Sequence, residues 1–213
     1  MHLFRPYAAA RVAFALIALL GLAATARAQE APDALVKRVS EEVLQIVKTD
    51  PKIQAGDPAR IRDLIETKLA PHFDFERMTA LAVGRGWRQA TPEQRKQLVE
   101  QFKTLLVRTY SNAFVQYRNE TISYKPFRAD PGATDVTVRT EVVRPGQAPV
   151  QIDYTLGKNG NEWKAYDVIV GGVSLVTNYR DEFNAQIQSG GVDGLVKALQ
   201  AKNAGPAPPP PVK

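Results

Sequence analysis

The chain of 213 residues contains no cysteine and only two histidines. Without cysteine it has no disulfide, no thiolate metal ligand and no cysteine nucleophile. It also lacks the glycine-rich patterns of nucleotide sites, the serine motif of α/β-hydrolases and the paired histidines of zinc proteases. These absences disfavour most enzyme classes, and we expect no catalytic centre, no metal site and no cofactor.

One combination of side chains keeps an enzymatic alternative open. The last two predicted strands carry Asp153, Tyr154, Tyr166 and Asp167, and cup-shaped α+β isomerases and dehydratases use a carboxylate with a tyrosine. Asp167 is a poor partner for Tyr166, because adjacent residues of a strand point to opposite faces. The isolated His72 fits a surface or capping residue better than a general base. A scaffold that binds protein is a further alternative.

Residues 1–28 have the pattern of a secretory signal peptide. Arginines precede the uncharged apolar stretch 12–24, and Ala26-Arg27-Ala28 fits the small-x-small cleavage rule. The apolar stretch is shorter than the roughly 20 residues that span a bilayer, which makes a membrane anchor the weaker interpretation. Cleavage removes three arginines and lowers the formal net charge from +6 to +3. We therefore expect a soluble periplasmic protein, too weakly basic for nucleic-acid binding.

Helical patterns fill the first half of the mature chain. Residues 32–48 carry apolar side chains three and four positions apart, which predicts an amphipathic helix. Asp57 before Pro58 predicts the start of a second helix, which reaches residue 70, and Asp74 predicts the cap of a third over 75–83.

The strongest start signal belongs to a long helix. Thr91 followed by Pro92 and Gln94 forms a capping box, with proline where its missing N–H costs nothing. The apolar periodicity continues to about residue 119. Later in the chain, residues 174–189 and 193–202 are predicted helices separated by Gly190-Gly191.

Four strands are predicted between these helical regions. Alternating or apolar runs cover 121–127, 136–142, 150–156 and 163–170, joined by turn sequences such as Lys158-Asn159-Gly160-Asn161. Strands this close in sequence, without crossover helices, form an antiparallel meander. The predicted fold class is α+β, with helices cupping one face of a curved four-stranded sheet.

Large apolar residues on the helix faces permit two interpretations. They include Phe73, Trp87 and Phe102, and they either fill a core or line a cup that is partly empty. Periodicity does not separate a filled core from a hollow one, so both interpretations stay open at this point.

The segment 163–183, WKAYDVIVGGVSLVTNYRDEF, resembles the signature of the MlaC family, also called toluene-tolerance proteins. The similarity extends, in order, to the segments 73–78 (FDFERM), 87–94 (WRQATPEQ) and 191–195 (GVDGL). It covers about residues 33–202. It departs at Gly172, where the family commonly has an acidic or polar residue, and in the proline-rich end.

The resemblance implies a nuclear-transport-factor-2-like cup with an apolar cavity for the acyl chains of a glycerophospholipid. It implies a periplasmic lipid shuttle that maintains outer-membrane lipid asymmetry. The implied partners are the substrate-binding ring of an inner-membrane ABC transporter and an outer-membrane lipoprotein–porin complex. We expect a monomer, with one lipid-binding domain over 29–204 and a disordered proline-rich tail over 205–213.

With this cup, the apolar residues that we expect to contact lipid come from two regions. The candidates from the helices are Phe75, Met78, Leu81, Phe102, Leu106 and Tyr110. The candidates from the end of the sheet and the following helix are Val168, Val170, Val173, Leu175, Val176 and Tyr179.

Overall fold

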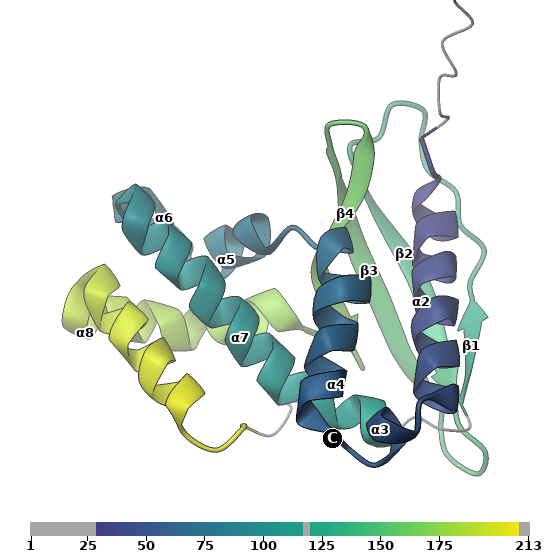
Figure 1. Ribbon diagram of the computed structural model, residues 1–213. Helices are drawn as coiled ribbons and strands as arrows, with labels where there is room; N and C mark the ends of the chain where they lie inside the picture. The colour runs from purple at the N-terminus through teal and green to yellow at the C-terminus, as the bar shows by residue number, and fades with distance from the viewer. Residues whose placement is uncertain (1–28, 117–119, 209–213) are drawn as a thin grey trace, which may run out of the picture.

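A computed structural model describes residues 29–116 and 120–208 (Figure 1). The predicted signal peptide, the predicted end of the long helix and the last residues of the tail lie outside this part. The described helices are α2 (Pro32–Thr49), α3 (Pro51–Gln54), α4 (Pro58–Leu64), α5 (Phe75–Val83), α6 (Arg85–Gln89), α7 (Pro92–Gln116) and α8 (Leu175–Ala204). The strands are β1 (Thr121–Tyr124), β2 (Asp135–Val143), β3 (Val150–Asn159), β4 (Glu162–Val170) and β5 (Val173–Ser174). The α+β class is confirmed.

Helix starts follow the capping signals in the sequence. The Asp57 carboxylate accepts from the N–H groups of Ala59 and Arg60 at the start of α4. The capping box of α7 is reciprocal, because Gln94 N–H donates to Thr91 Oγ1 (3.2 Å) and Thr91 N–H donates to Gln94 Oε1 (2.9 Å). Each contact satisfies an N–H group that has no acceptor within the first helical turn.

Asp50 joins α2 to α3 and gives a pH-dependent contribution to stability. Its Oδ1 accepts from the N–H of Lys52, and its Oδ2 accepts from Arg60 Nε at 2.7 Å. The Arg60 hydrogen bond, with backbone N–H donors, holds the pKa of Asp50 below its ordinary value of 3.8. A carboxyl whose pKa is lower in the folded state stabilises the fold above its unfolded pKa, and this contribution disappears as pH falls.

We expect Asp50→Asn to lower Tm at pH 7, because asparagine keeps a cap acceptor but loses the charge facing Arg60. The difference in Tm from the wild type should shrink as pH falls below about 4, because the unfolded chain takes up a proton at Asp50 there before the folded protein does. Thermal unfolding followed by circular dichroism between pH 3 and 7 measures this. Asp130→Asn, at an exposed loop carboxylate, is the matched control and should show no such convergence. A difference in Tm between Asp50→Asn and the wild type that stays constant from pH 3 to 7 would contradict the pH-dependent role of Asp50.

The second predicted helix is not a regular α-helix to its end. α4 stops at Leu64 and is followed by a π-helical turn, η1 (Ile65–Leu69), and a 3₁₀ turn, η2 (Ala70–His72). Pro71 has no N–H to donate, which prevents a regular helix from continuing through it. This irregular segment carries three residues of the cavity described below.

The sheet has five antiparallel strands in the order β1-β2-β3-β4-β5, so the expected number of four is wrong. The additional strand pairs Val173 with Val170 and Ser174 with Ile169. It consists of two residues after the glycine turn 171–172, too short for any alternation to show in the sequence.

A β-bulge at Tyr166 changes which residues of β4 face the concave side. Leu156 pairs with Ala165, whereas the preceding Thr155 pairs with Asp167, which leaves Tyr166 as the extra residue. After the bulge, Val168 and Val170 reach the cavity.

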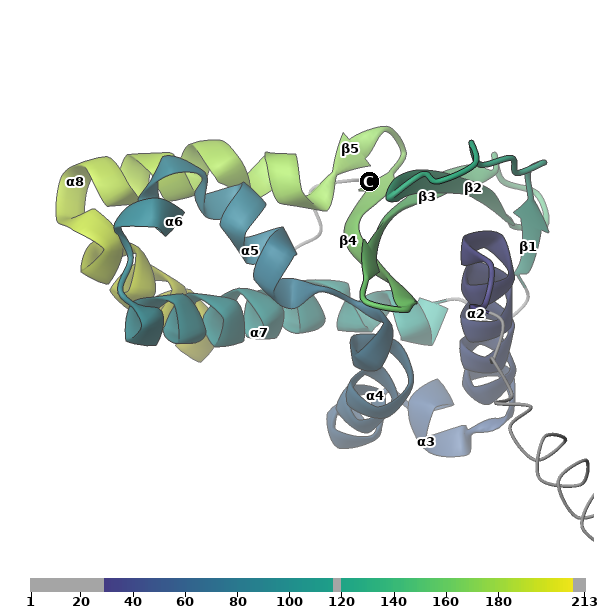
Figure 2. The same cartoon turned by 90° about the horizontal axis from the view of Figure 1, so that it is seen from above.

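Two hydrophobic clusters divide the molecule into two lobes (Figure 2). The helical lobe is built from α5, α6, α7 and α8, and its centre includes Phe102 and Phe183, both fully buried. The sheet lobe packs α2, α3, α4 and η1 against the sheet, with Leu156 and Val138 at its centre. α7 belongs to the helical lobe and extends to the sheet lobe in Figure 2, where its Val107 packs against the second cluster and so connects the two lobes.

The start and the break of α8 are both local effects. Asp167 of β4 accepts from Ser174 Oγ (2.6 Å) and from the N–H of Val176, which fixes the first turn of the helix. Gly191 adopts φ 65°, a conformation that glycine tolerates, and it interrupts the helix as the sequence predicted. Within the described ranges, no helix is both long and apolar enough to span a bilayer.

Candidate functional site

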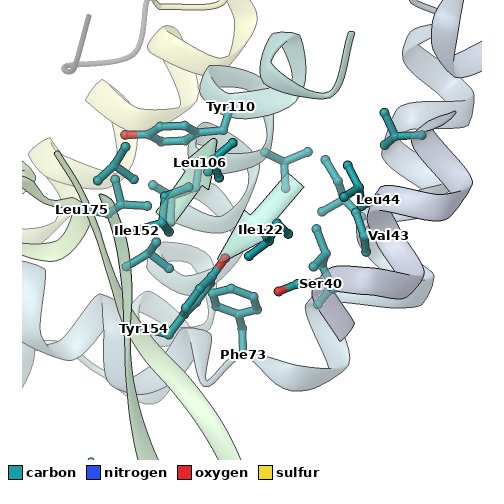
Figure 3. Close-up of a pocket in the computed structure, with 18 of the residues that line it drawn as sticks. Ser40, Val43, Leu44, Phe73, Leu106, Tyr110, Ile122, Ile152, Tyr154 and Leu175 are labelled. Carbon is teal, nitrogen blue, oxygen red and sulfur yellow. The ribbon is translucent and has the colours of Figure 1, made fainter. Parts of the chain in front are cut away.

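A cavity of about 300 Å³ lies where the two hydrophobic clusters meet (Figure 3). Met78 and Leu106 come from the cluster of the helical lobe, and Val43 and Ile65 come from the cluster of the sheet lobe. Phe73, which lies between η2 and α5, packs against both clusters. The cavity is therefore a gap between two separately packed cores, within the size range of roughly 300–1,000 Å³ of ligand pockets.

The wall of the cavity is almost entirely apolar. Of its 21 lining residues, 17 have hydrocarbon, aromatic or thioether side chains without a polar group. The complete lining is Ser40, Val43, Leu44, Val47, Ile65, Leu69, Ala70, Phe73, Phe75, Met78, Leu106, Val107, Tyr110, Glu120, Ile122, Val142, Ile152, Tyr154, Val168, Val170 and Leu175. A wall of this composition favours hydrocarbon over a polar or charged ligand.

The two tyrosines contribute the main hydroxyl groups of the wall and stay uncharged. Burial raises the pKa of Tyr110 and of Tyr154 above the ordinary tyrosine value, and the Ser40 side chain partly offsets this for Tyr154. In Figure 3, Tyr154 lies near Ser40 and Phe73, whereas Tyr110 lies near Leu106. The Tyr110 hydroxyl is buried and has no hydrogen-bond partner among the described residues. An acyl chain would therefore meet neutral phenols on this wall.

Seven of the twelve residues expected to contact lipid line the cavity. They are Phe75, Met78, Leu106, Tyr110, Val168, Val170 and Leu175. α5 and α7 bring the first four to one wall, and the end of β4 with the start of α8 supplies the other three. Residues far apart in the sequence thus meet at the junction of the lobes.

The structure does not bring the other five to the cavity. Phe102, Val176 and Tyr179 are buried inside the helical lobe, where the Phe102 ring lies 5.2 Å from the Tyr179 ring. Leu81 is 36% exposed on the outer side of α5, and Val173 pairs in β5. An apolar residue on a helix or strand can face a filled core, a cavity or solvent, and sequence spacing alone does not distinguish these surroundings.

Sequence reasoning missed the contribution of α2 and of the middle strands. Ser40, Val43, Leu44 and Val47 of α2 form one side of the cavity, opposite Ile152 of β3. The sequence contained signals for both contributions, since α2 has an apolar stripe and apolar and polar residues alternate along β3. What was missing is the information that α2 lies against the concave face of the sheet, as Figure 2 shows.

Asp153 and Tyr166 of the enzymatic alternative do not contact each other, because each has its own partners elsewhere. Asp153 Oδ2 accepts from Gln151 Nε2 (2.8 Å) and lies 3.9 Å from Arg139 Nε. The Tyr166 ring instead lies 3.5 Å beneath the Arg77 guanidinium group. Of the four residues of this alternative, Tyr154 alone lines the cavity. In the described part of the chain, no group of three histidine or carboxylate residues could hold a metal ion.

This chain is similar to a known protein family, to proteins of known sequence and to a protein of known structure. The model of the MlaC protein family matches residues 37–201. The toluene tolerance protein ttg2D of Pseudomonas putida is 30% identical over 190 residues, which cover 84% of this chain and 88% of the relative. The intermembrane phospholipid transport system binding protein MlaC of Haemophilus influenzae is 22% identical over 185 residues, covering 85% and 86%.

A solved structure is similar over most of its length. It is the phospholipid-binding protein from Ralstonia solanacearum, in complex with a phospholipid, with 43% sequence identity and a TM-score of 0.77. The match covers 81% of this chain and 96% of that protein.

Proposed function

Because the chain belongs to the MlaC family, we propose that it is a periplasmic carrier that binds a glycerophospholipid by its acyl chains. The observation that carries the proposal is the apolar cavity between the two lobes. Its lining residues on β3 and on α2, the helix that lies against the concave face of the sheet in Figure 2, support the nuclear-transport-factor-2-like cup that the sequence resemblance implies. The phospholipid bound by the similar Ralstonia solanacearum protein supports the class of ligand.

The energetics explain why such a carrier needs an apolar cavity. Burying one methylene group is worth about 0.8 kcal/mol, so two acyl chains with ~30 methylenes would cost roughly 24 kcal/mol to expose to water. A lipid does not cross an aqueous compartment unprotected against this cost. If the cavity offers the acyl chains nearly as many apolar contacts as a bilayer does, the free energy of transferring the lipid between membrane and carrier is close to zero.

We propose that the cavity takes the chains while the headgroup stays near solvent. The carrier then moves lipid between an outer-membrane lipoprotein–porin complex and the substrate-binding ring of an inner-membrane ABC transporter, and so maintains lipid asymmetry. Net direction has to come from such partners, because the sequence shows no known nucleotide-binding pattern. The relative named as a phospholipid transport system binding protein supports this role.

Native mass spectrometry of the mature protein from bacterial envelope extract tests the proposal. We expect a one-to-one complex whose added mass corresponds to a diacyl phospholipid, identified after organic extraction. Since the sequestered chains would be costly to expose, the lipid should persist through purification. A protein that arrives empty, and stays empty after incubation with liposomes, would contradict the carrier function.

A further inference from the structure

A second concave surface lies on the helical lobe and shares no lining residue with the cavity. It is a groove of about 650 Å³ between the α5–α6 corner and α8. We call it the arginine groove, and it is lined by Ala80, Leu81, Gly84, Arg85, Arg88, Arg180, Asn184 and Gln188. α5, α6 and α8 lie together in the helical part of Figure 2.

Local geometry fixes the walls of this groove. Gly84 has φ 61° and turns the chain sharply between α5 and α6. Gly86 is buried so close to α8 that a Cβ there would lie 2.5 Å from Ile187 Cδ1. On α8, Arg180 and Asn184 follow helical i, i+4 spacing, which puts them on one face of the helix. Arg180 Nε also donates to the Leu81 carbonyl (3.2 Å), which holds the arginine at the groove.

The charge of the arginine groove is unbalanced. Within residues 29–116 and 120–208, neither Arg85, Arg88 nor Arg180 forms an ion pair, whereas Lys202 of the same lobe pairs with Glu182. Three guanidinium groups in one concavity create a positive potential that attracts anions. A guanidinium group also binds a carboxylate through two parallel hydrogen bonds, which favours it at protein interfaces.

We propose that the arginine groove is a docking site for an acidic segment of a partner protein, an inference that rests on the proposed carrier function. The concave shape suits a protruding segment better than a flat membrane surface. Leu81, 36% exposed at the groove, offers an apolar contact beside the charges. α5 and α8 also carry the cavity residues Met78 and Leu175, so the partner would contact helices that line the cavity.

Binding of a synthetic peptide rich in glutamate and leucine to the mature protein tests the proposal. We expect Arg85→Glu/Arg88→Glu to weaken this binding about tenfold, which corresponds to about 1.4 kcal/mol. Arg62→Glu/Arg128→Glu makes the same change of net charge at exposed sites outside the groove, and it should change the affinity by less than about twofold. In NMR spectra of the wild type, the backbone amide signals that change position when peptide is added should belong to groove residues such as Gly84 and Asn184.

Three results would overturn the proposal. The first is an equal loss in both double variants, which would reflect net charge alone. The second is equal binding of a control peptide with glutamine in place of glutamate. The third is binding through Arg85 and Arg88 to phosphatidylglycerol vesicles without binding to the peptide, which would indicate a membrane contact. Phospholipid content is measured in the same samples, so loss of peptide binding with lipid retained separates this docking site from the carrier function.

Discussion

Val170→Trp is expected to weaken phospholipid binding by the protein about 30-fold. Val170 lines the cavity from the end of β4, where it pairs with Ile152 of β3. An indole in this position takes space that acyl methylenes would otherwise occupy. Losing the burial of two or three methylenes costs about 2 kcal/mol at about 0.8 kcal/mol each. This free energy corresponds to the expected change in affinity.

The matched control is Ile169→Trp, at the neighbouring residue of the same strand. Successive residues of a strand point to opposite faces, so this tryptophan lies away from the cavity. We expect its lipid content to match that of the wild type. Both variants should unfold cooperatively, which separates loss of the cavity from loss of the fold. Lipid extraction after equilibration with graded amounts of liposomes measures the affinity, and a wild-type affinity in folded Val170→Trp protein would remove Val170 from the binding site.

The fold was predictable because its boundaries depend on local chemistry. Asp57, Thr91 and Gln94 mark helix starts through hydrogen bonds to nearby N–H groups, and all three were assigned from the sequence alone. The irregular turns around Pro71 and the two-residue β5 were not predicted. Their geometry depends on a few backbone hydrogen bonds, which leave no periodic pattern in the side chains.

The cavity was only partly predictable because it depends on how the two lobes meet. Leu106 and Phe102 lie on the same helix and are both apolar and buried, yet one lines the cavity and the other fills the core. Spacing shows that both face inward but not what lies opposite. Phe102 meets the ring of Phe183 at 5.1 Å, whereas Leu106 faces the gap between the clusters. Whether an apolar residue of α7 lines the cavity or fills the core is therefore decided by tertiary packing.

Truncating two neighbouring leucines of α7 tests this distinction directly. Leu105 is fully buried in the cluster of the helical lobe and does not line the cavity, whereas Leu106 does. In lipid-free protein we expect Leu105→Ala to lower the free energy of unfolding by about 3–5 kcal/mol, because it opens a new void in a filled core. Leu106→Ala only enlarges an existing cavity and loses fewer contacts, so its cost should be near the lower limit of about 2 kcal/mol.

Urea unfolding with and without bound phospholipid measures both costs in the same experiment. A ligand that binds only the folded state stabilises it by an amount that grows with the logarithm of its affinity, so the lipid-dependent gain reports contact with the lipid. We expect Leu105→Ala to keep this gain, since its side chain lies away from the cavity, and Leu106→Ala to lose part of it. Equal losses in the lipid-free proteins would mean that the wall is packed as tightly as the core. The apolar faces would then form a solid interior, which would contradict a cavity that holds acyl chains.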